Sequence, residues 1–333
     1  MKLWHKTSFL FFVLFLLLAG AICLSLFTGS STFTLSELWT QLTKGEETGG
    51  AYRIFLYVRL PRTVAAIAAG AALAVSGTLI QGVLNNALAG PNIIGVNSGA
   101  GFCALLAASL FPAAVSLVPV AAFFGALITS MLIYSMAVRT GASRITLVLA
   151  GVAISGILSA GIDTLSVLFP DDVIGATGFM VGSFSGVTMS GLYPALILIL
   201  IGIALAMIFS YDLNILALGE ELAAGLGMRV PLIRFIFIAI SSLLAGAAVS
   251  FAGLLGFVGL MVPHICRRII GGDNRKLVPC SALVGATLTL ICDALGKCLF
   301  APFEIHVGII LAFLGGPFFL FLLLKKGRGR IYE

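Results

Sequence analysis

The stretch TVAAIAAGAALAVSGTLIQGV, residues 63–83, decides the fold of this chain. It carries no charged residue and consists mainly of alanine, glycine and aliphatic side chains. A helix of about 20 apolar residues is long enough to cross the hydrocarbon core of a bilayer. Small residues also allow neighbouring helices in a membrane to approach closely. We therefore expect residues 63–83 to form a transmembrane helix that packs against other helices.

The composition of the whole chain extends this expectation. Of its 333 residues, 60% are hydrophobic, 10% are charged and 39 are glycine. Soluble globular proteins typically carry about 25% charged residues. These values indicate an all-α, polytopic membrane protein whose apolar surface contacts membrane lipid. The net charge of +6 does not require a nucleic acid partner, and we expect none, because basic residues that gather in the cytoplasmic loops of a membrane protein explain it more simply.

Ten apolar runs of the sequence are candidate membrane spans. The third run is short, and the seventh and eighth nearly touch, so counts of nine or eleven stay open. No linker or long soluble segment interrupts them, and we expect one transmembrane domain over residues 1–333. The runs lie at 8–28, 63–83, 93–110, 115–137, 144–167, 191–210, 232–251, 254–270, 277–299 and 306–324.

The basic residues orient these spans. An even number of spans places both termini on the same side of the membrane. With both termini in the cytoplasm, 14 of the 19 lysine and arginine residues lie on the cytoplasmic side, which is the side that they favour. The remaining five lie outside, and they are Lys44, Arg53, Arg59, Arg62 and Lys297.

The segment VRLPRT, residues 58–63, places Arg59 and Arg62 on the outer side, against this rule. One interpretation is that both side chains reach lipid headgroups at the start of the second span. The other is that they form an outward basic patch for an acidic partner, since helical residues three apart share one face. The residues alone leave both interpretations open.

A short internal repeat favours a transporter. Residues 69–77 read AGAALAVSG and residues 245–253 read AGAAVSFAG, so both contain AGAA, then four residues, then glycine. Chance similarity in a chain rich in alanine and glycine is the alternative. If the repeat is real, it pairs the second span with the seventh. An offset of five spans reverses the orientation, which is the inverted-repeat plan of many transporters.

The sequence contains no motif for an enzyme or a bound cofactor. Its three histidines, His5, His264 and His306, form no HExxH, and no GxxxxGK[ST] phosphate loop is present. We expect no catalytic residue and no metal site, so ATP-driven transport would need another subunit to bind the ATP. The cysteines lie in or beside apolar runs without a CxxC pair, so we interpret them as small buried residues. They are Cys23, Cys103, Cys266, Cys280, Cys292 and Cys298.

The longest polar interruption between spans is SYDLNILALGEELAAGLGMRV, residues 210–230. Within it, GEELAAGLG predicts a short helix, because Glu220 and Glu221 favour a helix N-terminus and Gly225 and Gly227 end the helix. Its exposed side would present Leu222, Leu226 and small alanines. An ordinary connection between spans is one interpretation, and a helix that docks in the groove of a partner is the other.

Several motifs together resemble the permease family of ABC importers for ferric siderophores, haem and cobalamin. They are RLPR, GAALAVSGTLIQGVLNNALAGPNIIGVNSGAG, LGEELAAGLGM, GLLGFVGLMVPHICRRIIGGDNRKLVP and GGPFFLFLL, and the resemblance runs from about residue 50 to the C-terminus. It implies a ten-span type II importer subunit in the bacterial cytoplasmic membrane. It also implies a second permease subunit, identical or related, two cytoplasmic ATPases that hold ATP and Mg²⁺, and an external substrate-binding protein.

The resemblance also implies roles for individual residues. Arg59 and Arg62 match outer arginines that accept acidic residues of the binding protein, and Lys297 matches a further outer basic residue. The helix that sits in the ATPase cleft, within the cytoplasmic loop 211–231, matches nine residues. They are Gly219, Glu220, Glu221, Leu222, Ala223, Ala224, Gly225, Leu226 and Gly227.

The sequence departs from the family pattern at two places. The family's Asn-Pro-Leu-Ala is Asn86-Ala87-Leu88-Ala89 here, which predicts a less rigid turn after the second span. The family's Glu-Leu-Pro-Val-Gly is Glu304-Ile305-His306-Val307-Gly308 here. His306 would lie near the outer mouth, either as an interfacial side chain or as a ligand of haem or metal.

Two further charged groups have two interpretations each. VPHICRR places His264, Arg267 and Arg268 near the inner end of the eighth span, either as membrane anchors or beside the coupling helix. Asp293 and Lys297 are four residues apart and can form a helical ion pair, which competes with a docking role for Lys297.

The cargo and the energy source have alternatives. A ferric siderophore leads as the cargo, and haem and cobalamin stay open. An ion-coupled secondary transporter would need acidic residues within the spans, and Asp163 and Asp293 are the candidates. A polytopic membrane enzyme is the third class, and the missing catalytic motif weighs against it.

Overall fold

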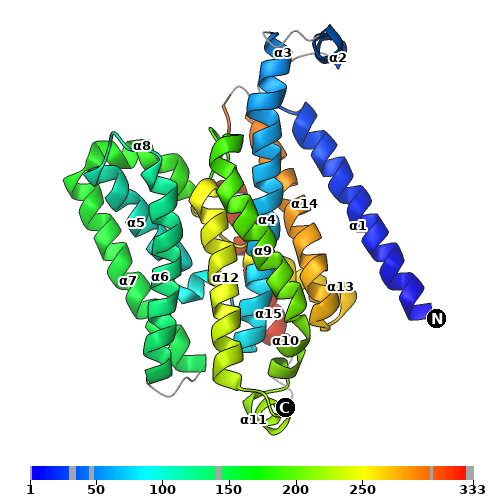
Figure 1. Cartoon of the computed structure of the whole chain (residues 1–333), viewed down its shortest axis with the longest axis vertical. Coiled ribbons are helices and arrows are strands. Elements are labelled where there is room, and N and C mark those ends of the chain that lie inside the picture. Colours follow the sequence, from blue (N-terminus) through cyan, green and yellow to red (C-terminus); the bar gives the residue numbers. More distant parts are fainter. Residues whose placement is uncertain (1, 30–34, 45–48, 140–143, 301–302, 328–333) are drawn as a thin grey trace.

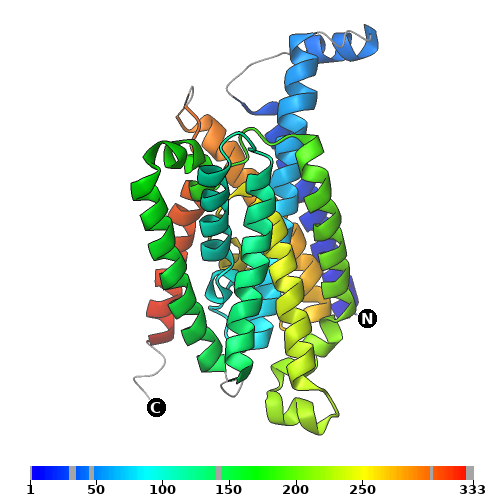
Figure 2. The same cartoon turned by 60° about the vertical axis from the view of Figure 1, so that its left-hand side comes forward.

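The computed structural model describes residues 2–29, 35–44, 49–139, 144–300 and 303–327, and this part of the chain is a helical bundle without a β-strand (Figures 1 and 2). The expected all-α class is thereby confirmed. In chain order the helices are α1 (Lys2–Phe27), α2 (Leu35–Lys44), α3 (Gly50–Arg53), the π-helical segment η1 (Ile54–Arg59), α4 (Leu60–Leu84), the 3₁₀ turn η2 (Pro91–Ile94), α5 (Val96–Leu110), α6 (Leu117–Arg139), α7 (Arg144–Leu168), α8 (Pro170–Val181), α9 (Met189–Ile208), α10 (Ser210–Ala217), α11 (Glu220–Gly225), α12 (Val230–Ala252), α13 (Val258–Ile270), α14 (Asn274–Cys298) and α15 (Val307–Gly327).

Each of the ten predicted spans falls on a helix of the bundle. Seven helices in the described residues are long and apolar enough to cross a membrane. Two shorter apolar helices are α5 and residues 307–322 of α15. The remaining predicted span falls on α13, which has 13 residues and is therefore only about 20 Å long. Helix α15 as a whole has 21 residues, so the predicted count of about ten includes two helices, α5 and α13, that are shorter than a full bilayer crossing.

Helix α4 lies at the centre of the bundle, as its small residues predict. It packs against α12 and α14, and nearly all of its side chains are buried. A Cβ atom at Gly70 or Gly285 would collide with the backbone carbonyl of the other residue, so α4 and α14 touch along their backbones. This close approach explains why the stretch at 63–83 contains so few large side chains.

The packing of the helices has the symmetry expected of an inverted repeat. Helices α4 and α12, which carry the two AGAA sequences, run in opposite directions (Figure 1). They are joined by a hydrogen bond of 2.7 Å between the hydroxyl oxygens of Ser76 and Ser241. Helix α4 packs against α14, and α12 packs against α6. The two partner helices, α14 and α6, are the ninth and the fourth predicted spans, so they are also five spans apart.

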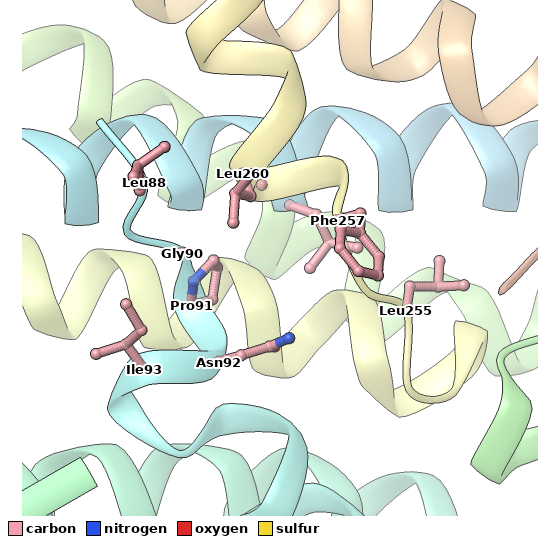
Figure 3. Close-up of a pocket in the computed structure, with 10 residues that line it drawn as sticks. Leu88, Gly90, Pro91, Asn92, Ile93, Leu255, Phe257 and Leu260 are labelled. Carbon is pink, nitrogen blue, oxygen red and sulfur yellow. The ribbon is translucent and has the colours of Figure 1, made fainter. Parts of the chain in front are cut away.

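Two segments outside the α-helices meet inside the bundle, and they explain the irregular third, seventh and eighth spans. Residues 85–95 follow α4, and residues 253–257 separate α12 from α13. The side-chain amide of Asn97 donates to the carbonyl of Leu255 between the two regions. An apolar pocket lies between them, lined by both segments (Figure 3). Such backbone is tolerated in a membrane protein where other protein surrounds it.

The turn at the first departure from the family pattern is closed by its own side chains. Asn85 adopts φ 47°, the left-handed conformation that ends α4. The Asn86 side chain accepts a hydrogen bond of 3.0 Å from the backbone N–H of Leu88. Ala87 therefore occupies a turn whose shape the two asparagines define.

Short helices mark the two ends of the bundle. Helices α2 and α3 lie at one end, called here the α3 end, and α11 lies at the other, the α11 end (Figures 1 and 2). The first residues of α1 and the last of α15 point to the α11 side. The sequence did not predict α2, α3, η1, α8 or α10, because these helices are too short or too polar to read as spans.

Candidate functional site

At the α11 end, the predicted helix over GEELAAGLG is confirmed. Helix α11 covers Glu220–Gly225, with Glu220 and Glu221 in its first turn, where carboxylates complement the helix dipole. Gly219 before it has φ 110° and Gly227 after it has φ 85°. Side chains other than glycine rarely adopt these values, so the two glycines allow the chain to enter and leave this short helix sharply.

Helix α11 exposes large apolar side chains. Leu222 is 63% exposed and Leu226 is 66% exposed, as the sequence predicts. Ala223 differs from the prediction, because it is fully buried against the rest of the chain. Leu222 on α11 and Leu226, which directly follows this helix, form a small exposed apolar surface that suits a protein contact.

An ion pair fixes α11 to the bundle. A terminal guanidinium nitrogen of Arg234 donates to the Glu220 carboxylate, and the Arg234 side chain is only 4% exposed. Arg234 belongs to α12, so the first turn of α11 is tied directly to the next long helix. A force applied to α11 would therefore reach α12.

A second set of contacts joins the same loop to α14. We call Asn214, Asp273 and Asn274 the amide clamp. The Asn214 amide donates to Asp273 Oδ1, and Asn214 Oδ1 accepts from the backbone and side-chain N–H groups of Asn274, all at 2.8 Å. Burial raises the pKa of Asp273, but hydrogen bonds from Asn214 and Arg275 outweigh this effect and hold the pKa below its ordinary value.

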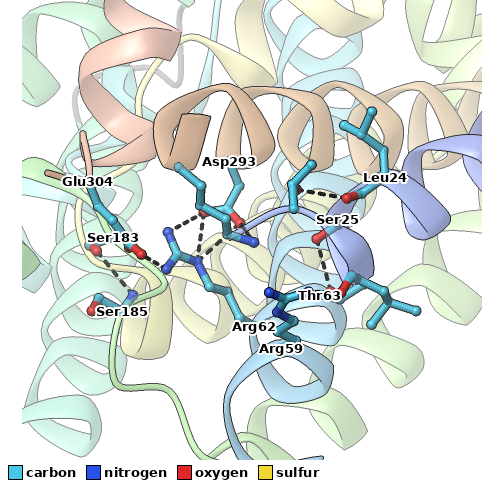
Figure 4. A network of polar contacts seen from close by, with 12 residues as sticks. Leu24, Ser25, Arg59, Arg62, Thr63, Ser183, Ser185, Asp293 and Glu304 are labelled. Carbon is cyan, nitrogen blue, oxygen red and sulfur yellow. Dashed lines mark hydrogen bonds and ion pairs between the residues drawn. The ribbon is translucent and has the colours of Figure 1, made fainter. Parts of the chain in front are cut away.

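The α3 end contains a cluster of ion pairs, which we call the arginine–carboxylate cluster: Arg62, Asp293, Lys297 and Glu304 (Figure 4). Arg62 Nε donates to both Asp293 oxygens at 3.0 and 3.1 Å, and a terminal nitrogen lies 3.0 Å from Oδ1. The other terminal nitrogen donates to Glu304 at 2.6 Å. Arg62 thus uses one edge for each carboxylate, an arrangement that suits the planar guanidinium.

The predicted ion pair between Asp293 and Lys297 is confirmed. The Lys297 ammonium lies 2.7 Å from Asp293 Oδ2, and the two side chains are 3% and 1% exposed. Asp293 therefore serves as a buried counter-ion for two cations at once. A buried charge that loses its partner is strongly destabilising, so the cluster depends on Asp293.

The outward basic patch expected at Arg59 and Arg62 differs from what the structure shows. Arg59 is 5% exposed and Arg62 is 8% exposed. A terminal nitrogen of Arg59 donates to the carbonyl of Leu26 at 2.7 Å. The physical reason is that helix continues from Gly50 to Leu84, so both arginines lie within a long helix flanked by α1 and α14. Their role in docking stays a prediction.

A small pocket beside this cluster gathers the three predicted docking residues. Its lining residues are Thr28, Gly29, Ile54, Val58, Arg59, Arg62, Lys297 and Glu304. Three of its side chains are cationic and one is acidic, and Asp293 lies behind them. Chemically, such a pocket is suited to an incoming carboxylate.

His264 and His306 lie outside both sites. His264 packs edge-on against the ring of Phe318, with ring centroids 6.0 Å apart. His306 is half-buried just before α15. Within the described ranges, no three histidine, cysteine, aspartate or glutamate side chains gather as metal ligands.

Several contacts of these sites were missed from the sequence. They are the pair Arg234–Glu220, the amide clamp and the contact Arg62–Glu304. Asp273 carries a usable signal, because aspartate directly before a helix is a favoured N-cap. No sequence signal identifies Asp293 and Glu304 as the partners of Arg62, since they lie 231 and 242 residues away along the chain.

Comparison with known proteins gives a consistent set of matches. The model of the FecCD transport family matches residues 16–325. The Fe(3+)-citrate import system permease protein YfmE of Bacillus subtilis (strain 168) is 39% identical over 81% of each chain. The hemin transport system permease protein HmuU of Yersinia pestis is 36% identical over 91% of each. The cobalamin import system permease protein BtuC of Halobacterium salinarum is 39% identical over 80% of this chain and 72% of that protein.

A solved structure shares the fold over nearly the whole chain. It is an inward-facing conformation of a metal-chelate type ABC transporter, and it aligns with a TM-score of 0.80 at 29% identity. The alignment covers 96% of this chain and 99% of that chain.

Proposed function

Since this chain belongs to the FecCD transport family, we propose that it is the permease subunit of an ABC importer for an iron chelate. A ferric siderophore is the leading cargo, with haem and cobalamin as the alternatives, and relatives named for iron citrate, hemin and cobalamin support this range. Residues 1–333 act as one permease domain. Transport proceeds by alternating access, in which the pathway opens to one side of the membrane at a time.

The observation that carries the proposal is that one bundle has contact sites at both ends. The α11 end offers the exposed side chains of Leu222 and Leu226, and the α3 end offers a cationic pocket. We assign the first to a cytoplasmic ATPase that holds ATP and Mg²⁺. We assign the pocket, with Arg59, Arg62 and Lys297, to acidic residues of a substrate-binding protein. Two permease subunits and two ATPases complete the transporter.

The proposed orientation places the α11 end and both termini in the cytoplasm. It is supported by the basic residues of the sequence, which gather at this end, and by the position of the first helix and the last (Figure 2). The α3 end then faces outward, toward a binding protein.

Cysteine labelling tests this orientation. In a variant without native cysteines, a cysteine at Ser185, which is exposed before α9, should react with an impermeant thiol reagent in intact cells. A cysteine at Glu221, exposed on α11, should react only after the membrane is opened. Labelling at Glu221 in intact cells would reverse the assignment of the two ends.

The ion-coupled alternative is weakened by the surroundings of its candidate acids. Asp293 is paired with Arg62 and Lys297, so it is not a free carboxylate that could carry an ion. Asp163 is exposed on α7 near the end of that helix, where water or a second subunit can solvate it.

Uptake by the reconstituted transporter distinguishes the energy sources. Vesicles containing this chain, its partner ATPase and a candidate binding protein should accumulate a ferric siderophore, hemin or cobalamin only when ATP is present. Vanadate should stop uptake and an uncoupler should not. Uptake that survives vanadate but collapses with the uncoupler would contradict the proposal and favour a secondary transporter. Chemical conversion of a substrate by the purified chain alone would favour a membrane enzyme.

A further inference from the structure

We propose that Glu304 occupies the place of a partner carboxylate on Arg62, and that the binding protein docks by exchanging its own acidic side chain for Glu304. This inference rests on the proposed function, because it concerns the same docking pocket. It adds Glu304 to the docking residues, and it adds a step in which the carboxylate of Glu304 is displaced from Arg62.

The two carboxylates on Arg62 differ in exposure. Asp293 is 1% exposed, belongs to α14 and also binds Lys297. The Glu304 side chain is 30% exposed and accepts a hydrogen bond from a terminal nitrogen of Arg62. One edge of the guanidinium is therefore paired with a buried carboxylate, while the other edge is paired with a group at the rim of the pocket.

The position of Glu304 in the chain permits exchange. It lies in the connection between α14 and α15, outside any helix, whereas Asp293 is within a 25-residue helix. The next residue, Ile305, donates its backbone N–H to the carbonyl of Gly296 at 2.9 Å, so the connection is anchored directly beside Glu304. Rotation of the Glu304 side chain about its own bonds can release Arg62 while this backbone contact is kept.

The charges of the site favour exchange over simple opening. Among the described side chains of the site, Arg59, Arg62 and Lys297 supply three positive charges, and Asp293 and Glu304 supply two negative ones. If Glu304 left alone, Arg62 would be largely buried with part of its hydrogen-bonding capacity unmet, which is costly. An arriving carboxylate takes over this contact, so no intermediate with an unpaired buried cation is needed.

The arrangement also explains how buried arginines can act in docking. The pocket opens beside Arg59 and Arg62, and its other walls are small or apolar: Thr28, Gly29, Ile54 and Val58. An acidic side chain that enters from the α3 end meets all three cations in surroundings that water screens poorly. Glu304 disfavours the binding of other anions to Arg62, because any competing anion must displace a carboxylate that is already bound there.

The substitution Glu304→Gln tests the exchange, because it keeps the shape of the side chain and removes its charge. The probe is the binding protein that supports uptake in the reconstituted assay. We expect Glu304→Gln to tighten its binding by about threefold to tenfold, since docking no longer breaks an ion pair. Glu37→Gln, which removes an exposed carboxylate of α2 at the same end, should change the affinity less than about twofold.

Salt dependence provides a second measurement. In the native protein one ion pair replaces another on docking, so raised salt changes the affinity for the binding protein only slightly. In Glu304→Gln, docking creates an ion pair without breaking one, and binding should weaken more steeply as salt rises. Unchanged or weaker binding of a well-folded Glu304→Gln variant, or an unchanged salt dependence, would overturn the inference. If no binding protein supports ATP-driven uptake, the proposed function itself fails, which is a separate outcome.

Discussion

Replacing Leu222 and Leu226 together by aspartate is expected to abolish ATP-driven uptake. Leu222 is exposed on α11 and Leu226 is exposed directly after it, so the substitutions leave the fold of the chain intact. In the proposed complex they lie in an apolar groove of the ATPase, where a carboxylate without a partner costs several kcal/mol. Because each 1.4 kcal/mol weakens binding tenfold, ATPase association should fall by at least about 100-fold.

The measurement pairs uptake in vesicles with co-purification of the ATPase. Val115→Asp is the matched control, since Val115 is a 74% exposed aliphatic residue in the connection between α5 and α6, at the opposite end of the bundle. It should retain both the ATPase and uptake. Normal uptake by the Leu222→Asp, Leu226→Asp variant would exclude α11 as the coupling contact.

The second large effect concerns folding. Asp293→Asn removes the charge that Arg62 and Lys297 share, while their side chains stay 9% and 3% exposed. Breaking a buried ion pair by removing one partner typically costs about 3–5 kcal/mol. We expect a large loss of folded protein and a markedly lower Tm in detergent, measured by thermal denaturation with size-exclusion chromatography.

A control and a rescue separate this effect from a general loss of acidity. Asp163→Asn makes the same chemical change on the exposed face of α7 and should leave the Tm nearly unchanged. Adding Lys297→Met to Asp293→Asn removes one of the two orphaned cations and should restore part of the Tm. A stable Asp293→Asn single variant would mean that water or Glu304 compensates the cluster.

Much of this architecture could be predicted from the sequence, for identifiable reasons. The spans follow from apolar runs, because a bilayer imposes a minimum length on a helix. Helix α11 follows from its glycines and its two leading glutamates, and the pair Asp293–Lys297 follows from helical spacing alone. Each of these features is local, so a single segment contains the information that specifies it.

The features that could not be predicted depend on distant segments. Burial of Arg59 depends on the carbonyl of Leu26 in α1, and burial of Arg62 depends on carboxylates beyond residue 290. The charge rule predicts only which side of the membrane an arginine occupies, not whether a neighbouring helix covers it. The amide clamp likewise joins residues 59 and 60 positions apart, which no periodic pattern links.

The contact between Arg62 and Asp293 has a consequence for the synthesis of the protein. The two residues are 231 positions apart, so at about 5–20 residues per second the ribosome delivers Asp293 roughly 10 to 50 seconds after Arg62. During this interval neither Asp293 nor Glu304 has been made, so the Arg62 guanidinium can pair only with water and lipid headgroups at the edge of the bilayer. The buried contacts of Arg62 can thus form only when α14 has followed α4 into the membrane. The central helix α4, which is synthesised early, therefore acquires its buried ion pairs from α14, which is among the last helices to be synthesised.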